Sequence, residues 1–292
     1  MPKTDPIRAV SVVSTGTVAI RPQHIATHGS PALWWALTER QWTQPLPINA
    51  YVIEHQDGLV LFDTGQRPDS LADPDYFPRG PLRLLYRRLG RAEIGPDQTL
   101  TQQMARIGYD IGDVRTAVIS HLHHDHAGGL AELRHAEIVV AADEWKSMQD
   151  PMPATRGIFP RHIDLPGIRW RKITPEPAQD PGLSPFEAAH DLLGDASLML
   201  LPTPGHTPGS LSLLVRRPGR PPLLMVGDMA FDLDCMAREQ VPGVGKRSSL
   251  VDSTRKVNGL ASRYPGLVVL PAHDPTAASR LAAANQAAES TR

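Results

Sequence analysis

The sequence is poor in several features, and each absence argues against a class of protein. Its 292 residues include one cysteine, Cys235, so no disulfide can form within the chain and a reducing compartment fits. No apolar run approaches the length that spans a bilayer, and no signal-peptide pattern opens the chain. Basic and acidic residues nearly balance, 30 against 31, which argues against a nucleic-acid or anionic membrane surface. We therefore expect a cytoplasmic protein that binds neither nucleic acid nor membrane.

A Gly-x-Ser-x-Gly sequence is also absent, which argues against a serine hydrolase of the α/β type. Proline, by contrast, is abundant. Many of the 29 prolines cluster around residues 151–185 and 217–222. Proline clusters of this kind predict long ordered loops in a chain that is otherwise rich in short apolar segments.

These apolar segments predict a chain of alternating strands and helices. The predicted strands are residues 7–14, 48–54, 58–62, 114–120, 137–141, 197–201, 211–215, 223–226 and 267–270. The predicted helices are residues 97–107, with Asp97 as N-cap, 143–149, 250–264 and 277–288. The third helix should bury a face formed by Val251, Val257, Leu260 and Ala261. We expect a single domain over residues 1–292, of the α/β (α+β) class. Its two β-rich halves would pack face to face with helices outside, in a four-layer αβ/βα sandwich.

Residues 121–126 read His-Leu-His-His-Asp-His and carry the strongest functional signal. Imidazole and carboxylate groups are the ligands that a divalent metal such as zinc prefers. Alternate residues of an extended segment point the same way, so His121 and His123 can converge on one ion. Asp125 continues that alternation, whereas His126 breaks it and can turn toward a second ion. His124 faces neither set, and we assign it to the surface or to a supporting position. The alternative is an exposed histidine loop without a ligand.

Three later segments also combine a strand end, glycine or proline, and a metal-ligand residue. They contain His206, Asp228 and His273. Taken singly each is weak, because a histidine in a proline-glycine loop is more often structural and an aspartate after glycine more often forms a turn. Together they supply one histidine for each of two ions and one carboxylate between them, which is the set that a two-metal hydrolase requires.

With these elements the chain resembles the metallo-β-lactamase superfamily, and within it most of all the N-acyl homoserine lactone lactonases. The matching elements are the motif at 121–126, His206, Asp228, His273 and the Asp63-Thr-Gly65 turn. The resemblance implies two divalent ions per chain, zinc in preference to manganese, iron or cobalt. One ion would take His121, His123 and His206. The other would take Asp125, His126 and His273, with Asp228 and a hydroxide between the two ions. Asp63 would support the site from beneath, unless its turn merely ends a strand.

The resemblance implies a hydrolase that opens lactones or esters, a quorum-quenching type of activity, with Asp125 moving the proton to the leaving alkoxide. One position departs from the lactonases. They carry a tyrosine three residues after the bridging aspartate, whose hydroxyl helps to polarise the substrate carbonyl, and here that position is Phe231. Another donor would have to replace it, or the substrate differs. Thioester hydrolysis of the glyoxalase II type, aryl-ester or phosphotriester hydrolysis, and a non-catalytic metal-binding protein are the alternatives.

Two segments are candidates for the substrate pocket of this chain, in which only 5% of the residues are aromatic. The first is an aromatic N-terminal loop, about residues 24–47, with Trp34, Trp35 and Trp42, which would line a pocket together with Phe231 or else pack as ordinary core. The second is an insertion at about residues 66–95, which reads as a lid or as an amphipathic surface helix. We expect a small-molecule substrate with a hydrophobic tail, and the resemblance suggests a homodimer.

Overall fold

The computed structural model describes residues 5–287, and all structural statements below refer to them. The strands are β1 Ile7–Ile20, β2 Leu46–His55, β3 Gly58–Phe62, β4 Gly90–Glu93, β5 Val114–Val118, β6 Glu137–Ala141, β7 Arg169–Ile173, β8 Glu176–Pro177, β9 Ala188–Asp191, β10 Leu198–Pro202, β11 Leu211–Val215, β12 Leu223–Gly227 and β13 Val268–Pro271. The helices are α1 Pro22–Ile25, α2 Ala32–Thr38, α3 Asp69–Ala72, α4 Pro81–Leu89, α5 Leu100–Arg106, α6 Ala142–Met148, α7 Pro160–Ile163, α8 Leu233–Ala237, α9 Arg247–Arg263 and α10 Ala277–Gln286. Short 3-10 helices are η1 Ile111–Asp113, η2 Gly128–Glu132, η3 Pro153–Arg156 and η4 Pro181–Leu183.

The strands form two sheets whose apolar side chains alternate between two faces. The first sheet has the order β4-β1-β2-β3-β5-β6-β7, and the second has the order β13-β12-β11-β10-β9-β8. In β3, Val60 and Phe62 point into the core between the sheets, while Leu59 and Leu61 point to the outer face under α5. Because both faces are covered, these strands are apolar at nearly every position instead of alternating with polar residues.

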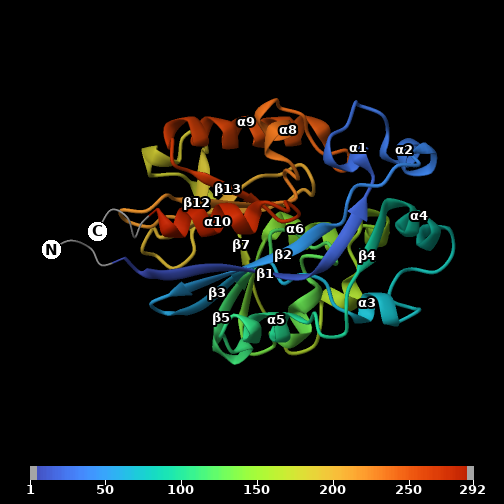
Figure 1. The fold of residues 1–292 in the computed structure, drawn as a ribbon, viewed down its shortest axis with the longest axis horizontal. Helices are drawn as coiled ribbons and strands as arrows, with labels where there is room; N and C mark the ends of the chain where they lie inside the picture. Colours follow the sequence, from blue (N-terminus) through green and yellow to red (C-terminus); the bar gives the residue numbers. More distant parts are fainter. Residues whose placement is uncertain (1–4, 288–292) are drawn as a thin grey trace.

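Helices cover the outer face of each sheet and complete four layers (Figure 1). The outer face of the second sheet packs on α9 through Val257 and Leu260, and the outer face of the first sheet packs on α5 through Leu100 and Met104. Helix α10 joins the core between the sheets through its small and apolar residues, of which Leu281 is the largest. The αβ/βα sandwich predicted from the sequence is therefore confirmed.

The direction of the strands brings five strand ends to one edge of the sandwich. Strands β3 and β5 are parallel in the first sheet. In the second sheet β12 is parallel to β13 and antiparallel to β11, which is antiparallel to β10. The carboxyl ends of β10, β12 and β13 therefore share one edge. Chain segments that leave strands at such an edge form a crevice in which side chains from distant parts of the sequence meet.

Several predicted elements differ from those observed. Asp97 is not the N-cap of the first predicted helix, because Thr99 accepts a hydrogen bond from the backbone of Gln102 and starts α5 in a capping box. Helix α9 begins one turn earlier than predicted, and Val251 and Ala261 are only half-buried beside the buried Val257 and Leu260. The last residue of the fourth predicted helix, Ala288, lies outside the described residues.

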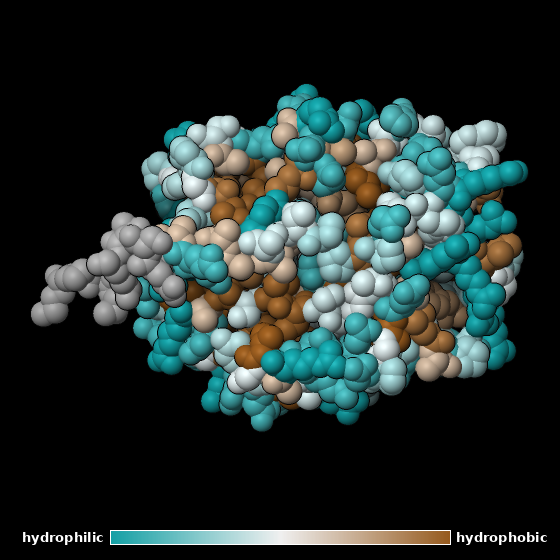
Figure 2. All heavy atoms as spheres, in the orientation of Figure 1, coloured by the Kyte–Doolittle hydropathy of each residue, from teal (hydrophilic) through white to brown (hydrophobic). Residues whose placement is uncertain are grey.

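The two segments singled out for the pocket are partly helical. Helix α2 occupies the centre of the aromatic N-terminal segment, and residues 66–95 contain α3, α4 and β4. Helices α2 and α4 lie together at one end of the molecule (Figure 1). Hydrophilic residues cover much of the face seen in Figure 2, with apolar residues between them. Within the described residues, no helix combines the length and the apolar character that a membrane span requires.

Candidate metal centre

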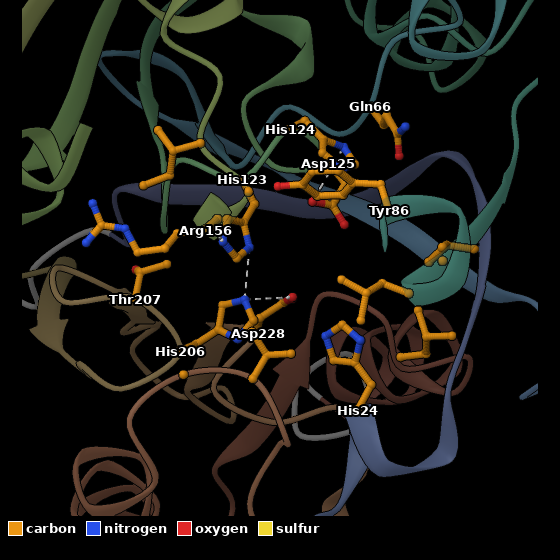
Figure 3. Close-up of a pocket in the computed structure, with 18 of the residues that line it drawn as sticks. His24, Gln66, Tyr86, His123, His124, Asp125, Arg156, His206, Thr207 and Asp228 are labelled. Atoms are coloured by element: carbon orange, nitrogen blue, oxygen red, sulfur yellow. Dashed lines mark hydrogen bonds and ion pairs between the residues drawn. The ribbon is translucent and has the colours of Figure 1, made fainter. Parts of the chain in front are cut away.

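Six of the predicted ligands form two groups at the shared strand edge, and the seventh residue, Asp228, lies between these groups. The ligand atoms of His121, His123 and His206 lie within 4.8 Å of one another, and so do those of Asp125, His126 and His273. Asp228 lies between them: its Oδ1 is 3.1 Å from His126 Nε2 and 3.3 Å from His273 Nε2, and its Oδ2 is 3.5 Å from His206 Nε2. Figure 3 shows His123, His206 and Asp228 converging from different strand ends. The structure therefore brings together all seven residues that the sequence indicated.

The ring nitrogens that face away from the centre are held by hydrogen bonds in four of the five histidines. His121 Nδ1 contacts Ser120 Oγ at 3.0 Å, His126 Nδ1 contacts Asp63 Oδ2 at 2.8 Å, and His273 Nδ1 contacts the carbonyl oxygen of Pro47 at 2.8 Å. His123 is turned the other way: its Nε2 donates to the carbonyl oxygen of Arg156 at 2.7 Å. Such outer contacts fix the ring orientation and the tautomer, and so leave the inner nitrogen free for a cation.

Asp63 joins two of the strand ends beneath the centre. Its Oδ1 accepts from the backbone nitrogen of Ser120 at 2.7 Å, and its Oδ2 accepts from Ser120 Oγ at 2.9 Å and from His126. Its φ of 63° lies in the left-handed region, which is costly for a residue with a side chain and recurs at functional sites. The geometry is that of a carboxylate that orients a ligand histidine.

The electrostatics of the cluster pair buried carboxylates with buried imidazoles. Burial opposes the charged form of His273, but Asp228 and Asp125 outweigh it and raise the pKa of His273 to about 10. Burial likewise opposes the charged form of His126, and the carboxylates raise its pKa well above the usual value. The pKa of His121 is held far below its usual value by burial and by the neighbouring imidazoles, which leaves a neutral ring. Without metal, the carboxylates of Asp125 and Asp228 thus pair with the protonated rings of His126 and His273. Bound cations would take the place of these protons.

The residues fit a pair of divalent cations. Within residues 5–287, His121 Nε2 is buried without a hydrogen-bond partner, and His126 Nε2 and Asp228 Oδ1 lie 3.1 Å apart without the geometry of a hydrogen bond. Buried polar atoms are nearly always partnered, so atoms left over at one point indicate a ligand that completes them. Imidazole nitrogens with carboxylate oxygens, and no thiolate, suit zinc and several other first-row divalent ions.

Glu144, at the start of α6, was not identified from the sequence, yet it connects the two ligand loops. It is fully buried. Its Oε1 accepts from the backbone nitrogen of Leu122 at 2.9 Å, and its Oε2 accepts from the backbone nitrogen of Gly209 at 3.0 Å. A Cβ at Gly209 would come within 2.2 Å of the Glu144 backbone nitrogen, so the close approach requires glycine. No local pattern reveals this role, because an acidic residue in the first turn of a helix is common.

A cavity of about 1120 Å³ opens beside the centre. His123, Asp125, His206 and Asp228 lie in its wall (Figure 3), and so does His273. Its apolar lining comes from β1, from the 66–95 insertion and from later loops, and includes Val18, Ile20, Leu71, Phe77, Leu85, Tyr86, Leu89, Ile158 and Phe231. The insertion therefore forms part of the cavity wall, together with its arginines Arg83, Arg87 and Arg91.

Of the four aromatic residues predicted to line a pocket, only Phe231 is among the side chains that line this cavity in the described part of the chain. Trp34 is 65% exposed on the outside of α2, whereas Trp35 is fully buried. Trp42 lies between two guanidinium groups, with Arg21 at 3.6 Å and Arg91 at 4.2 Å from its ring centroid. The tryptophans thus pack or face outward: α2 buries Trp35 and exposes Trp34, and Trp42 packs against two arginines.

His124 lies in an aromatic box beside the metal groups. Its ring stacks on Phe159 with 3° between the planes, and Tyr76, Phe77 and Tyr86 meet it edge-on. Burial lowers the pKa of His124 to about 4, so the ring is neutral. It belongs to none of the metal groups found among the described residues, which agrees with the supporting position expected for it.

Comparison with known proteins agrees with this fold. Residues 43–273 match the model of the metallo-β-lactamase superfamily. The chain belongs to this superfamily and is a metal-dependent hydrolase of its lactonase-like branch. An N-acyl homoserine lactonase of Rhizobium radiobacter, AttM, is 32% identical over 236 residues, which cover 80% of this chain and 83% of the relative. An N-acyl homoserine lactonase of Bacillus sp is 27% identical over 215 residues, covering 72% of this chain and 74% of the relative.

Solved structures show the same fold. An N-acyl homoserine lactone hydrolase, with the product N-hexanoyl-L-homoserine at its catalytic metal center, superposes with a TM-score of 0.72 at 19% identity, over 92% of this chain and 94% of the other. AidC, a dizinc quorum-quenching lactonase, superposes with a TM-score of 0.60 at 15% identity, over 94% of this chain and 92% of the other.

Proposed function

We propose that this protein opens the ring of N-acyl homoserine lactones or of closely related lactones and esters, using two bound divalent ions, zinc in the first place. The observation that carries the proposal is the position of Asp228, between two groups of three ligands beside a cavity with apolar walls. The relatedness to N-acyl homoserine lactonases at about 30% identity supports the substrate class.

In this proposal the seven residues have distinct positions around the ions. His121, His123 and His206 would hold one ion, Asp125, His126 and His273 would hold the other, and Asp228 would serve both groups. When bound, such a pair of ions lowers the pKa of a water molecule and polarises a carbonyl group. Asp63 and Glu144 would hold the ligand loops in place through their hydrogen bonds.

Asp125 is the proposed proton carrier. Its carboxylate lies at the cavity wall, with its Oδ2 3.5 Å from His273 Nε2 and its side chain 19% exposed. A carboxylate that reaches both the centre and the cavity can take a proton on one side and give it to the leaving alkoxide on the other. The apolar lining from the insertion would hold the acyl chain, which makes hydrophobic burial the source of affinity for longer tails.

The test is a substrate panel measured by proton release with purified protein of known metal content. The panel holds short- and long-chain acyl homoserine lactones, γ- and δ-lactones, an aryl ester, a glutathione thioester and a phosphotriester. We expect about two metal equivalents and a preference for acyl lactones, and both should disappear in Asp228→Ala. Protein that binds no transition metal at neutral pH would contradict the dinuclear centre. Strong turnover of the thioester or phosphotriester alone would assign the same site to the alternative hydrolases.

A further inference from the structure

Phe231 lines the cavity with a ring that has no hydroxyl, and this ring contacts two imidazoles. It stacks on the ligand His273 with ring centroids 5.4 Å apart and 9° between the planes. The centroid of the His24 ring lies 5.4 Å from that of Phe231, with 59° between the planes. A phenylalanine ring has no hydrogen-bond donor, whereas the neighbouring His24 ring has one.

His24 enters the site from a part of the chain far from the ligand motifs. It lies in α1 and lines the same cavity as Asp228 and His273. Its ring is turned from the backbone toward the centre of the site (Figure 3). The fully buried Trp35 packs against the His24 ring, with the two ring centroids 5.9 Å apart. The His24 carbonyl oxygen also accepts a hydrogen bond from the backbone nitrogen of Gly243 at 3.1 Å, so the segment is anchored at two points.

The His24 side chain has unused hydrogen-bonding capacity. Within residues 5–287 its Nδ1 is buried without a partner. Burial lowers the pKa of His24 to about 4, so the ring is neutral and keeps one N–H donor and one acceptor. An unpartnered buried nitrogen beside a cavity indicates that a ligand completes it.

Several other donors in the cavity wall are already engaged. The Tyr86 hydroxyl donates to the carbonyl oxygen of Ala154, and the Thr207 hydroxyl contacts Ser210 Oγ at 2.7 Å. Arg156 is bound to Asp150 and to the carbonyl oxygen of Ser147, at 3.0 and 3.1 Å. His24 is the neutral donor that combines a free nitrogen with a position next to Phe231.

We propose that His24 is a catalytic residue, whose ring N–H donates a hydrogen bond to the substrate carbonyl oxygen as negative charge develops there, at a part of the wall where Phe231 offers no donor. This inference rests on the proposed function. A fixed donor aimed at developing charge acts mainly on the transition state, so its removal should lower kcat more than it raises KM.

The test uses metal-loaded protein and N-hexanoyl homoserine lactone. His24→Ala should lower kcat on the order of 10²-fold, with the metal content unchanged by elemental analysis. His24→Gln, which keeps an N–H donor, should retain more of kcat than His24→Ala. Adding Phe231→Tyr to His24→Ala should restore much of the loss, because it supplies a hydroxyl beside the same site. Calorimetric titration with the product N-hexanoyl-homoserine gives a readout without turnover, and His24→Ala should weaken this binding.

The matched control is His190→Ala. His190 also has a buried ring nitrogen without a partner among the described residues, but it lies in β9 and does not line the cavity. Its removal should leave kcat and product binding unchanged.

If wild-type protein opens the lactone and His24→Ala keeps the wild-type kcat, the role of His24 is overturned while the proposed function stands. If wild-type protein turns over none of the carbonyl substrates in the panel, the proposed function fails first and the inference fails with it. If His24→Ala does not fold, as judged by its thermal transition, the test uses His24→Gln alone. A folded His24→Gln variant whose kcat is as low as that of Asp228→Ala would contradict the role.

Discussion

Asp63 fixes the orientation of His126, one of the proposed metal ligands, through a hydrogen bond to its ring. We expect Asp63→Asn to weaken metal binding about 10- to 100-fold, the usual cost of losing an outer partner of a ligand histidine. The amide keeps one oxygen but places an NH2 group against His126 Nδ1 or Ser120, which already act as donors. Competition with a chromogenic chelator measures the affinity.

Asp195→Asn is the control for this substitution. Asp195 also accepts from a buried histidine, since its Oδ2 lies 3.0 Å from His55 Nε2, but this pair is outside the cavity. The variant should therefore lose stability without losing metal affinity. Equal metal affinity in wild type and Asp63→Asn would show that the carboxylate only ends a strand.

At the scale of single residues, the sequence indicated the seven residues of the candidate centre and Asp63 beneath it, but neither Glu144 nor His24. The motif at 121–126 concentrates imidazoles beyond what a surface loop needs, and His206, Asp228 and His273 each follow an apolar strand. Glu144 and His24 stand in ordinary local surroundings. Their roles arise from contacts across 65 residues for Glu144 with Gly209, and from a cavity assembled by the whole fold for His24. Long-range contacts of this kind leave no local pattern.

At the scale of elements, α6 holds the two ligand loops together through one carboxylate. We expect Glu144→Gln to lower the free energy of unfolding by about 1–3 kcal/mol, because one of the two buried backbone donors, at Leu122 or Gly209, loses its acceptor. Metal affinity should fall as well, since both loops carry ligands. Denaturant unfolding and the chelator competition measure the two effects.

Glu132→Gln is the matched control for Glu144→Gln. Glu132 also accepts from the backbone, but it does so with a single oxygen, from Thr101 at 2.9 Å, and this bond joins η2 to α5 and not one ligand loop to the other. Its substitution should leave metal affinity unchanged. Unaltered stability and metal affinity in Glu144→Gln would contradict the role assigned to α6.

Buried strands were predicted more accurately from the sequence than the edge strand β7. Strands β3, β6 and β11 were predicted to the residue because apolar runs bounded by polar turns define them. Strand β7 reads Arg-Trp-Arg-Lys-Ile and was missed, because it is an edge strand whose pairing with β6 depends on the partner and not on its own composition. The proline-rich region thus contains sheet structure as well as loops.

At the scale of the whole molecule, protons and cations compete for one centre. The pKa of His273 is raised to about 10 in the folded chain, from an ordinary value of 6.5, because Asp228 and Asp125 outweigh the effect of burial. The resulting stability is fully present below pH 6.5 and is lost as the pH rises through 10. We therefore expect the Tm of metal-free protein to fall between pH 7 and pH 9, about the range in which this stabilisation declines.

Differential scanning fluorimetry with and without a chelator checks this dependence. Bound cations displace the protons from His126 and His273, so metal-loaded protein should show a weaker or opposite trend over the same range. In Asp228→Asn the decline should be smaller, because the main carboxylate that raises the pKa of His273 is gone. A metal-free Tm that stays constant or rises with pH would refute this account of the cluster.

The ligands are divided between the two sheets, and this division ties cation supply to the integrity of the chain. The motif at 121–126 follows a strand of the first sheet, while His206, Asp228 and His273 follow strands of the second. Ions bound between them would crosslink the two sheets of the sandwich. Above saturation, each tenfold rise in free cation would add about 1.4 kcal/mol to the stability of the folded state for each ion bound. The lifetime of the protein would then follow metal availability as closely as its activity does.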